Sequence, residues 1–177
     1  MINKIFLDCG AWNGQSVKVF RQKYDMRYEY FIFSFEANPL FTENFPHFDR
    51  HMLCKKAVWI YDGYVDFYID NSKKRAGSTI MKEKTSGDLD SNPIRVECID
   101  LSRFIEKSFK PEDEIILKLD IEGAEYQVLN KMIEDGTMSY IDQLFIEWHW
   151  NKVGVVQKEH NELVKKIDIP IKERWKV

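Results

Sequence analysis

The chain has 177 residues, of which 44% are hydrophobic and 31% charged, and its formal net charge at pH 7 is -3. A chain of this length can form one domain with a full hydrophobic core. Its slightly negative net charge excludes the generally basic surface that is typical of nucleic-acid-binding proteins. No window is apolar enough to predict a membrane span. The three cysteines lie far apart, with no CxxC or Cys/His spacing typical of zinc, so we expect reduced thiols and a cytoplasmic protein.

Hydrophobic periodicity predicts alternating strands and helices along the first half of the chain. In chain order the expected elements are a strand at residues 5–7, a helix at 15–24, a strand at 30–35, a helix up to residue 51 that Pro46 interrupts, and strands at 52–59 and 65–69. Asp62-Gly63 is a turn dipeptide, so a β-hairpin is expected near residues 57–69. The polar residues 70–93 predict a long loop, and loops of this length are usually functional or mobile.

The second half of the chain continues the same alternation. Its expected elements are a strand at residues 94–99, a helix at 101–109, a strand at 115–120, a helix that Gly123 opens and Gly136 closes, a strand at 143–149, a helix at 159–167 and the start of a last strand at 169–171. Strands that alternate with helices predict an α/β domain, with a mostly parallel central sheet covered on both faces.

Acidic residues stand at the ends of several predicted strands. Asp8, Glu36 and Asp120 each follow an apolar run directly, and Glu147 lies in a fourth strand. In parallel sheets ligands bind beyond the carboxyl ends of the strands, where these acids would meet. The sequence therefore predicts a binding site at this edge of the sheet.

The segment Asp8-Cys9-Gly10-Ala11-Trp12-Asn13-Gly14 places a G-x-x-x-G spacing directly after the first strand. Glycine allows a backbone to approach a ligand closely, and Glu36 at the end of the next strand can accept hydrogen bonds from both hydroxyls of a ribose. A dinucleotide site would need a middle glycine, which is absent here, and Trp12 would crowd a diphosphate. A sulfonium cofactor without phosphates fits these residues better. The alternative is that both glycines serve only as turn residues.

In order along the chain, these blocks resemble the FkbM-type methyltransferases. That family shows an Asp-x-Gly-Ala-x-x-Gly loop, a Phe-Glu-Pro-x-Pro segment, an Ala-Val segment with a glycine turn, Gly-Ser-Ser, a Lys-x-Asp-x-Glu-Gly-Ala-Glu block and a Glu-x-His strand end. The matching segments here are residues 8–14, 35–39, 57–58 with 62–63, 77–79, 118–125 and 147–149. The block at 118–125 is the most specific. Ala37 replaces a proline of the pattern, and Thr79 replaces its second serine.

The resemblance implies a single domain over residues 1–177 with a Rossmann-like class I methyltransferase fold and S-adenosylmethionine as cofactor. The cofactor-binding residues that it implies are Asp8, Gly10, Ala11, Trp12, Asn13, Gly14, Ser16, Glu36, Ala37, Asn38, Ala57, Val58, Ser78 and Asp120. The C-terminal end is short for this fold, which usually finishes with an antiparallel strand pair. An exposed sheet edge there would favour a homodimer.

Two pairs of residues spaced by two, Asp120 with Glu122 and Glu147 with His149, are the predicted catalytic residues. If their strands are neighbours, the four side chains converge on the reacting centre. Such a set suits a divalent ion, Mg²⁺ or Mn²⁺, bound by Asp120, Glu147 and His149, or a His/Asp base without metal. Alternatively, Glu122 is a helix N-terminal acid and His149 a structural histidine.

Two further residues of the block at 118–125 carry expectations without assigned chemistry. Lys118 points away from its apolar neighbours in a buried strand, so it should pair with an acid. Glu125 is expected on the helix surface or as an ion-pair partner.

The leading functional hypothesis is an O-methyltransferase that acts on a hydroxyl, by family habit often that of a sugar in a glycan or natural product. The acceptor would be a small molecule or glycan whose pocket uses residues 70–93. Two alternatives stay open: an NAD-dependent or nucleotide-sugar oxidoreductase, and a non-catalytic domain that binds S-adenosylmethionine.

Overall fold

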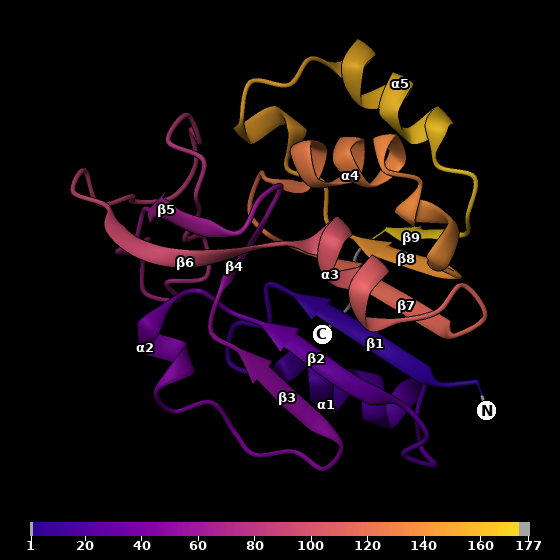
Figure 1. Ribbon diagram of the computed structural model, residues 1–177. Coiled ribbons are helices and arrows are strands. Elements are labelled where there is room, and N and C mark those ends of the chain that lie inside the picture. Colours follow the sequence, from indigo (N-terminus) through magenta and orange to yellow (C-terminus); the bar gives the residue numbers. More distant parts are fainter. Residues whose placement is uncertain (1, 174–177) are drawn as a thin grey trace.

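Six parallel strands form the main sheet of the computed structural model, which describes residues 2–173 (Figure 1). Their order is β3-β2-β1-β7-β8-β9, and their bounds are β1 (Lys4–Cys9), β2 (Phe31–Phe35), β3 (His51–Cys54), β7 (Glu114–Leu119), β8 (Gln143–Ile146) and β9 (Ile171–Glu173). The chain builds outward from β1 to β3 and then returns to the other side of β1 with β7. Ligands of such sheets bind where the strand order reverses, which is here beyond β1 and β7.

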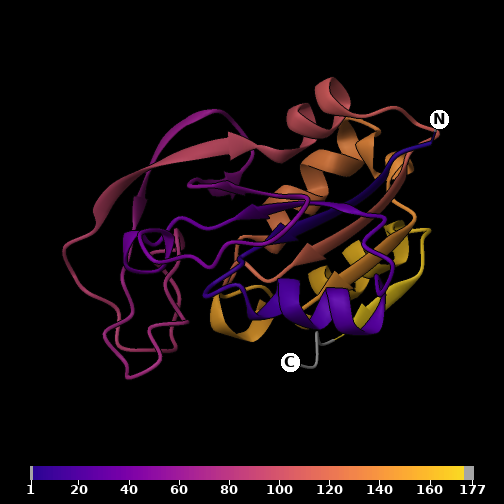
Figure 2. The same cartoon turned by 90° about the horizontal axis from the view of Figure 1, so that it is seen from below.

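Helices cover both faces of this sheet, so the predicted α/β class is confirmed. Their bounds are α1 (Gln15–Lys23), α2 (Pro39–Thr42), α3 (Leu101–Ser108), α4 (Glu125–Glu134) and α5 (Gln157–Lys166), with short 3-10 helices η1 (Thr137–Tyr140) and η2 (Trp150–Lys152). Figure 2 shows α1 on one side of the sheet and α3 and α4 on the other. Within residues 2–173, no helix has both the length and the apolar character needed to cross a bilayer.

Alternate side chains of β1 enter two separate cores, because neighbouring residues of a strand face opposite sides of the sheet. Phe6 packs against α1, where its ring stacks on that of Phe20 with 3.9 Å between the ring centroids. Ile5 and Leu7 face the other way and join a larger cluster with side chains of α3 and α4, among them Leu129. Burial on both faces explains why the central strands are almost continuously apolar.

A second, three-stranded sheet lies beyond the carboxyl ends of β1 and β2 (Figure 1). Its strands are β4 (Ala57–Trp59), β5 (Gly63–Phe67) and β6 (Ile94–Asp100). The β-hairpin predicted near residues 57–69 is wrong, because β6 lies between β4 and β5, parallel to the first and antiparallel to the second. Ala57 and Phe67 form a buried cluster with Cys98 of β6. An isolated hairpin would leave these apolar side chains in water.

Two other predicted elements have different bounds in the structure. The strand expected at residues 52–59 is two strands, since β3 ends at Cys54 in the main sheet and β4 belongs to the small sheet. The helix expected up to residue 51 ends at Thr42. Pro46 follows and has no backbone N–H with which to continue a helix.

The segment between β5 and β6 is an ordered loop built around one buried side chain, that of Asp70. The Asp70 carboxylate accepts hydrogen bonds from the backbone N–H groups of Ser72, Gly77 and Asp88 and from the Ser72 hydroxyl. Burial by itself would raise the pKa of Asp70, but these hydrogen bonds lower it to about 2. These hydrogen bonds connect distant parts of the loop predicted at residues 70–93, and the Asp70 carboxylate accepts them in its charged form at neutral pH.

The ends of β1 and β7 touch through Gly10. An added Cβ at Gly10 would lie 1.8 Å from the carbonyl oxygen of Asp120, and the residue has a left-handed φ of +79°. The backbone N–H groups of Gly10 and Ala11 donate to the carbonyl oxygen of Phe35, the last residue of β2. Glycine at this position thus holds the first loop against both neighbouring strand ends.

Replacing Gly10 with alanine should lower the free energy of unfolding by at least about 3 kcal/mol, because a steric clash adds to the cost of the left-handed backbone. Gly136→Ala is the matched control, since Gly136 has a φ of +78° and no atom within 4 Å of an added Cβ. The control should lose only about 1–2 kcal/mol. Chemical denaturation measures both, and equal losses would contradict the contact with Asp120 as the cause.

Candidate active site

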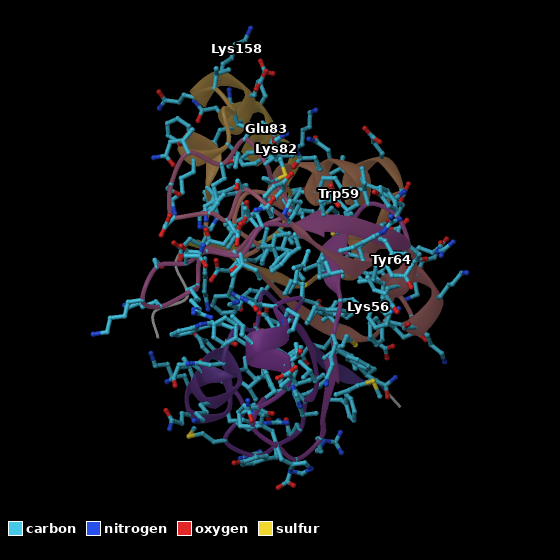
Figure 3. All side chains as sticks on the ribbon, turned by 90° about the vertical axis from the view of Figure 1, so that its left-hand side faces the viewer. Lys56, Trp59, Tyr64, Lys82, Glu83 and Lys158 are labelled. Atoms are coloured by element: carbon cyan, nitrogen blue, oxygen red, sulfur yellow. The ribbon has the colours of Figure 1, made fainter. Side chains whose placement is uncertain are left out.

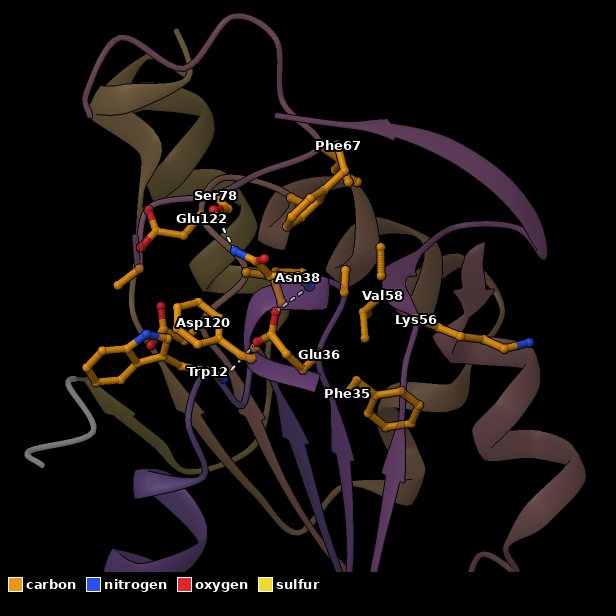
Figure 4. A pocket seen from close by; sticks show the side chains of 18 of the residues that line it. Trp12, Phe35, Glu36, Asn38, Lys56, Val58, Phe67, Ser78, Asp120 and Glu122 are labelled. Carbon is orange, nitrogen blue, oxygen red and sulfur yellow. Dashed lines mark hydrogen bonds between the residues drawn. The ribbon is translucent and has the colours of Figure 1, made fainter. Parts of the chain in front are cut away.

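A cavity opens at the carboxyl ends of β1, β2 and β7, between the main sheet and the small sheet (Figure 4). Ten of the residues predicted for the site line it: Gly10, Trp12, Glu36, Ala37, Asn38, Ala57, Val58, Ser78, Asp120 and Glu122. They come from segments far apart in the sequence. The cavity therefore lies where the strand order predicted a ligand site.

Several lining residues escaped the sequence prediction: Phe35, Phe41, Lys56, Phe67, Arg75, Ala76, Ile80, Ile121 and Ala124. Most of them are apolar, and in the sequence they are indistinguishable from core residues. The sequence offers one signal for predicting them, which is adjacency to a predicted site residue. Phe35 precedes Glu36, and Lys56 precedes Ala57. Arg75, Ala76 and Ile80 come from the loop at residues 70–93, which was expected to form part of the pocket.

Seven predicted site residues do not line the cavity: Asp8, Ala11, Asn13, Gly14, Ser16, Glu147 and His149. Asp8 and Ser16 are buried below the first loop, where the Ser16 hydroxyl donates to Asp8 over 2.5 Å. Gly14 has a left-handed φ of +80° and starts α1. The members of this set from residues 8–16 shape the first loop and α1, so their contribution to the cavity is indirect.

Glu36 lies at the floor of the cavity and is 8% exposed (Figure 4). Its two carboxylate oxygens accept hydrogen bonds from the backbone N–H groups of Trp12 and Asn38, each over 2.7 Å. Burial raises the pKa of Glu36 to about 7 in spite of these two hydrogen bonds. Each oxygen can accept one further hydrogen bond, so the carboxylate can bind a ligand that offers two donors.

Lys118 connects two of the predicted acids below the cavity. Its ammonium is 3.2 Å from a carboxylate oxygen of Asp8 and 3.8 Å from one of Asp120, and it donates to the carbonyl oxygen of Gly10 over 2.9 Å. Burial would lower the pKa of Lys118, but the charges of Asp8 and Asp120 outweigh it and raise that pKa above its usual value. Lys118 thus has the acidic partner predicted for it and stays charged.

A strained turn follows β7 and presents Asp120 and Glu122 to the cavity. Glu122 has a left-handed φ of +55°, and Gly123 has a φ of +117° with Val153 against it. Glu125 closes the turn, since its carboxylate accepts the backbone N–H groups of Ile121 and Gly123. Glu125 is fully buried, so its expected place on the helix surface is wrong. The other expectation, that it is an ion-pair partner, is confirmed by its contact with His149.

The loop at residues 70–93 is attached to this turn by two hydrogen bonds. The buried ammonium of Lys84 is 2.6 Å from a carboxylate oxygen of Glu122 and donates to the carbonyl oxygen of Gly77. The Thr79 hydroxyl donates to the backbone carbonyl of Glu122 over 2.8 Å. Glu122 therefore has a structural partner in addition to its place in the cavity wall.

The predicted pair Glu147 and His149 follows β8, and the two side chains differ in exposure although they lie 3.7 Å apart. The Glu147 side chain is 48% exposed, whereas His149 is completely buried. His149 Nδ1 is 2.9 Å from a carboxylate oxygen of Glu125. Burial would lower the pKa of His149, but Glu125, followed by Glu122, outweighs it and raises that pKa above its usual value.

The predicted metal set differs from the observed cluster in one residue. Asp120, Glu122 and His149 each place one ligand atom within 4.8 Å of the other two. Glu147 lies outside this group, with its carboxylate oxygen 3.7 Å from His149 Nε2. The strand that was expected to carry both Glu147 and His149 ends at Ile146, so the spacing of two no longer puts them on one face.

A comparison with protein families matches residues 8–174 to the methyltransferase FkbM domain. The chain belongs to the FkbM methyltransferase family. This match covers nearly the whole chain and supports methyl transfer as its activity. Searches of curated proteins and of solved structures gave no match. In this FkbM domain the cavity, the first loop and the turn after β7 occur together at one edge of the sheet.

Glu36 should make the stability of the ligand-free protein depend on pH. Its pKa in the folded protein is about 7 and in the unfolded chain about 4.5, so the folded state retains its proton between these values. Stability from this group is present below pH 4.5 and is lost as pH rises through 7, by up to about 3 kcal/mol.

Glu36→Gln keeps a neutral side chain of the same shape and should remove this loss. The difference in the free energy of unfolding between the wild type and the variant, measured by denaturation from pH 5 to pH 8, isolates Glu36 from His149. A difference that stays constant with pH would contradict the raised pKa.

Proposed function

We propose that this FkbM domain is an S-adenosylmethionine-dependent O-methyltransferase that acts on a hydroxyl group of a sugar in a glycan or natural product. The family match supports the transfer of a methyl group. The cofactor and the acceptor are argued below from the cavity and its surroundings.

The observation that carries the cofactor assignment is the buried carboxylate of Glu36 at the floor of the cavity. Backbone N–H groups of Trp12 and Asn38 hold it in one orientation, with its remaining acceptor positions available to a ligand. The two hydroxyls of a ribose are matching donors. Glu36 would thus bind the adenosine half of S-adenosylmethionine.

Trp12 favours this cofactor over a dinucleotide. The Trp12 side chain lines the cavity next to Gly10, where a pyrophosphate would need bare backbone at the start of a helix. Its ring also meets that of Phe41 edge to face, 6.0 Å between centroids, so it is held in place by packing. Together with the family match, this disfavours the oxidoreductase alternative.

Asp120 is the residue that we place at the reacting centre. It follows β7, is partly exposed in the cavity, and lies near the buried ammonium of Lys118. Methyl transfer needs a nucleophile in line with the methyl group and the sulfur, and alignment alone can supply roughly 7–11 kcal/mol of the barrier. The acceptor oxygen forms a bond to the methyl carbon, the carbon–sulfur bond breaks, and sulfur keeps its electron pair.

The proton of the acceptor hydroxyl must leave in the same reaction. Asp120 can accept it as a base, because its carboxylate lines the cavity. The sulfonium charge of the cofactor is compatible with the nearby acids Glu36 and Glu122, and this charge disappears as the methyl group is transferred.

A partly exposed aromatic side chain on β4 supports a sugar as acceptor. Trp59 is half-buried and packs partly against the core; it does not line the cavity itself, but it lies on the same side of β4 as Ala57, which does. Its ring meets that of the exposed Tyr61, with 6.5 Å between centroids. An aromatic face of this kind can pack against the apolar C–H face of a sugar ring. Figure 3 shows Trp59, Tyr64 and Lys56 on this side of the molecule.

Calorimetric titration tests the cofactor assignment. S-adenosylmethionine and S-adenosylhomocysteine should bind one site, and NAD should give no heat at the same concentrations. Glu36→Gln should weaken binding of both by about tenfold or more, since the amide offers the ribose hydroxyls a single acceptor oxygen. Binding of NAD alone would favour an oxidoreductase, and cofactor binding without turnover on any hydroxyl acceptor would favour a non-catalytic domain.

Trp59→Ala should raise the KM for a glycan acceptor by about tenfold, in line with the loss of one aromatic contact. It should leave the affinity for S-adenosylmethionine unchanged. Tyr64→Ala is the matched control, because Tyr64 is exposed but lies in β5 with its ring against Arg95. A radiolabel transfer assay with a panel of sugars gives the KM values. Equal effects of the two substitutions would argue against contact with the acceptor at Trp59.

A further inference from the structure

Three potential ligand atoms converge where β7 and β8 end. One carboxylate oxygen each of Asp120 and Glu122 and one imidazole nitrogen of His149 lie within 4.8 Å of one another. Two ligands on opposite sides of a small divalent ion are separated by about 4.2 Å. The three side chains therefore need only a small inward movement to share one ion.

A second, independent observation concerns His149 itself. Its side chain is completely buried, and Nε2 has no hydrogen-bond partner among the described residues. This nitrogen faces the acids, 3.5 Å from a carboxylate oxygen of Glu122 and 3.7 Å from one of Glu147. A buried polar atom without a hydrogen bond destabilises the folded protein. The position of His149 Nε2 among the acids therefore indicates that this nitrogen binds a partner.

The other imidazole nitrogen is held in the way that metal-binding histidines usually are. Nδ1 lies 2.9 Å from the carboxylate of Glu125, which is fully buried and fixed by the backbone N–H groups of Ile121 and Gly123. Such a carboxylate accepts a hydrogen bond from Nδ1–H, so the proton stays on Nδ1 and the Nε2 lone pair is left for a cation. Glu125 thus orients His149 and selects its tautomer.

We propose that Asp120, Glu122 and His149 bind one divalent metal cation at the edge of the cavity. A direct role of His149 as a base fits less well, because the side chain has no exposed atom and does not line the cavity. Asp120 and Glu122 do line it. A cation shared by the three connects the buried imidazole to the space that the acceptor occupies.

The charges around the cluster are compatible with a cation. Asp120, Glu122 and Glu125 carry three negative charges, and Lys118 and Lys84 offset two of them. Lys84 contacts Glu122, and Lys118 contacts Asp120. The two buried lysines therefore offset only part of the negative charge of the acids, and a net negative charge remains for a cation.

The ligand types favour a cation that accepts both oxygen and nitrogen. Carboxylates suit Mg²⁺ and Mn²⁺, and imidazole suits the later first-row metals. Mn²⁺ is compatible with this mixed set and can be followed directly by its paramagnetic signal.

The role of the cation rests on the proposed methyl transfer. A metal-bound hydroxyl is a stronger acid than a free one, so the acceptor oxygen would lose its proton to solvent before or during attack. With the cation bound, Asp120 would hold the metal instead of accepting the proton itself. The bonds made and broken remain those of the displacement: oxygen to carbon forms, carbon to sulfur breaks, and the sulfur keeps the electron pair.

Titration of the full chain with Mn²⁺, after treatment with a chelator and its removal, tests the site by electron paramagnetic resonance of the free ion. We expect saturable binding of one Mn²⁺ per chain. His149→Ala and Glu122→Gln should each weaken binding by at least tenfold. Glu112→Gln is the matched control and should bind as the wild type does, because Glu112 is an exposed acid that precedes β7, at the opposite end of that strand from the cluster.

The absence of saturable binding overturns the proposal, as does an unchanged affinity in both cluster variants or an equal loss in the Glu112 variant. Glu122→Gln keeps the test decisive should His149→Ala fail to fold, which circular dichroism detects. Calorimetry with S-adenosylmethionine in the presence of EDTA separates the two proposals. Cofactor binding without Mn²⁺ binding overturns only the metal site, and Mn²⁺ binding without cofactor binding overturns only the proposed function.

Discussion

The buried ammonium of Lys118 is the contact on which the rest of the site depends. It lies between Asp8 at the end of β1 and Asp120 after β7, and it also donates to the carbonyl oxygen of Gly10. Removing one partner of a buried ion pair leaves an uncompensated charge, which typically costs about 3–5 kcal/mol. The charge of one lysine thus fixes two loops that come from opposite halves of the chain. Because the loops are fixed, the cavity between them has a defined shape before any ligand arrives.

The acids at this edge of the sheet have different surroundings and hence different functions. Asp8 is enclosed by Ser16, Ser34 and Lys118 and supports the loop from below. Glu36 lines the cavity, and burial raises its pKa to about 7 although two backbone N–H groups donate to its carboxylate. Glu125 is surrounded by donors and acts on His149. Neighbouring charge, burial and hydrogen bonding therefore give three similar acids different places in the structure. Asp8 supports the first loop, Glu36 lines the cavity and Glu125 orients His149.

Much of the fold could be predicted from the sequence, because the parallel strands are apolar on both faces and their ends carry acids or glycine. The hairpin prediction was wrong because it used only the turn signal at Asp62-Gly63, which is local. The position of β6 between β4 and β5 depends on the burial of Phe67 and Cys98 by residues distant in sequence. The same limit applies to the site. Strand-end residues could be predicted by position, but the burial of Glu125 depends on how the turn after β7 closes.

The two anchors of the loop at residues 70–93 have a consequence for protein engineering. Lys84 and Thr79 attach this loop to Glu122, while Asp70 organises its interior. A loop transplanted from another enzyme to change the acceptor would remove the counter-charge of Glu122 along with the side chains that the loop contributes to the cavity. Successful exchanges should therefore retain these three side chains and vary only the stretches between them. Selectivity in this scaffold can be redesigned in segments, not by replacing the loop as a whole.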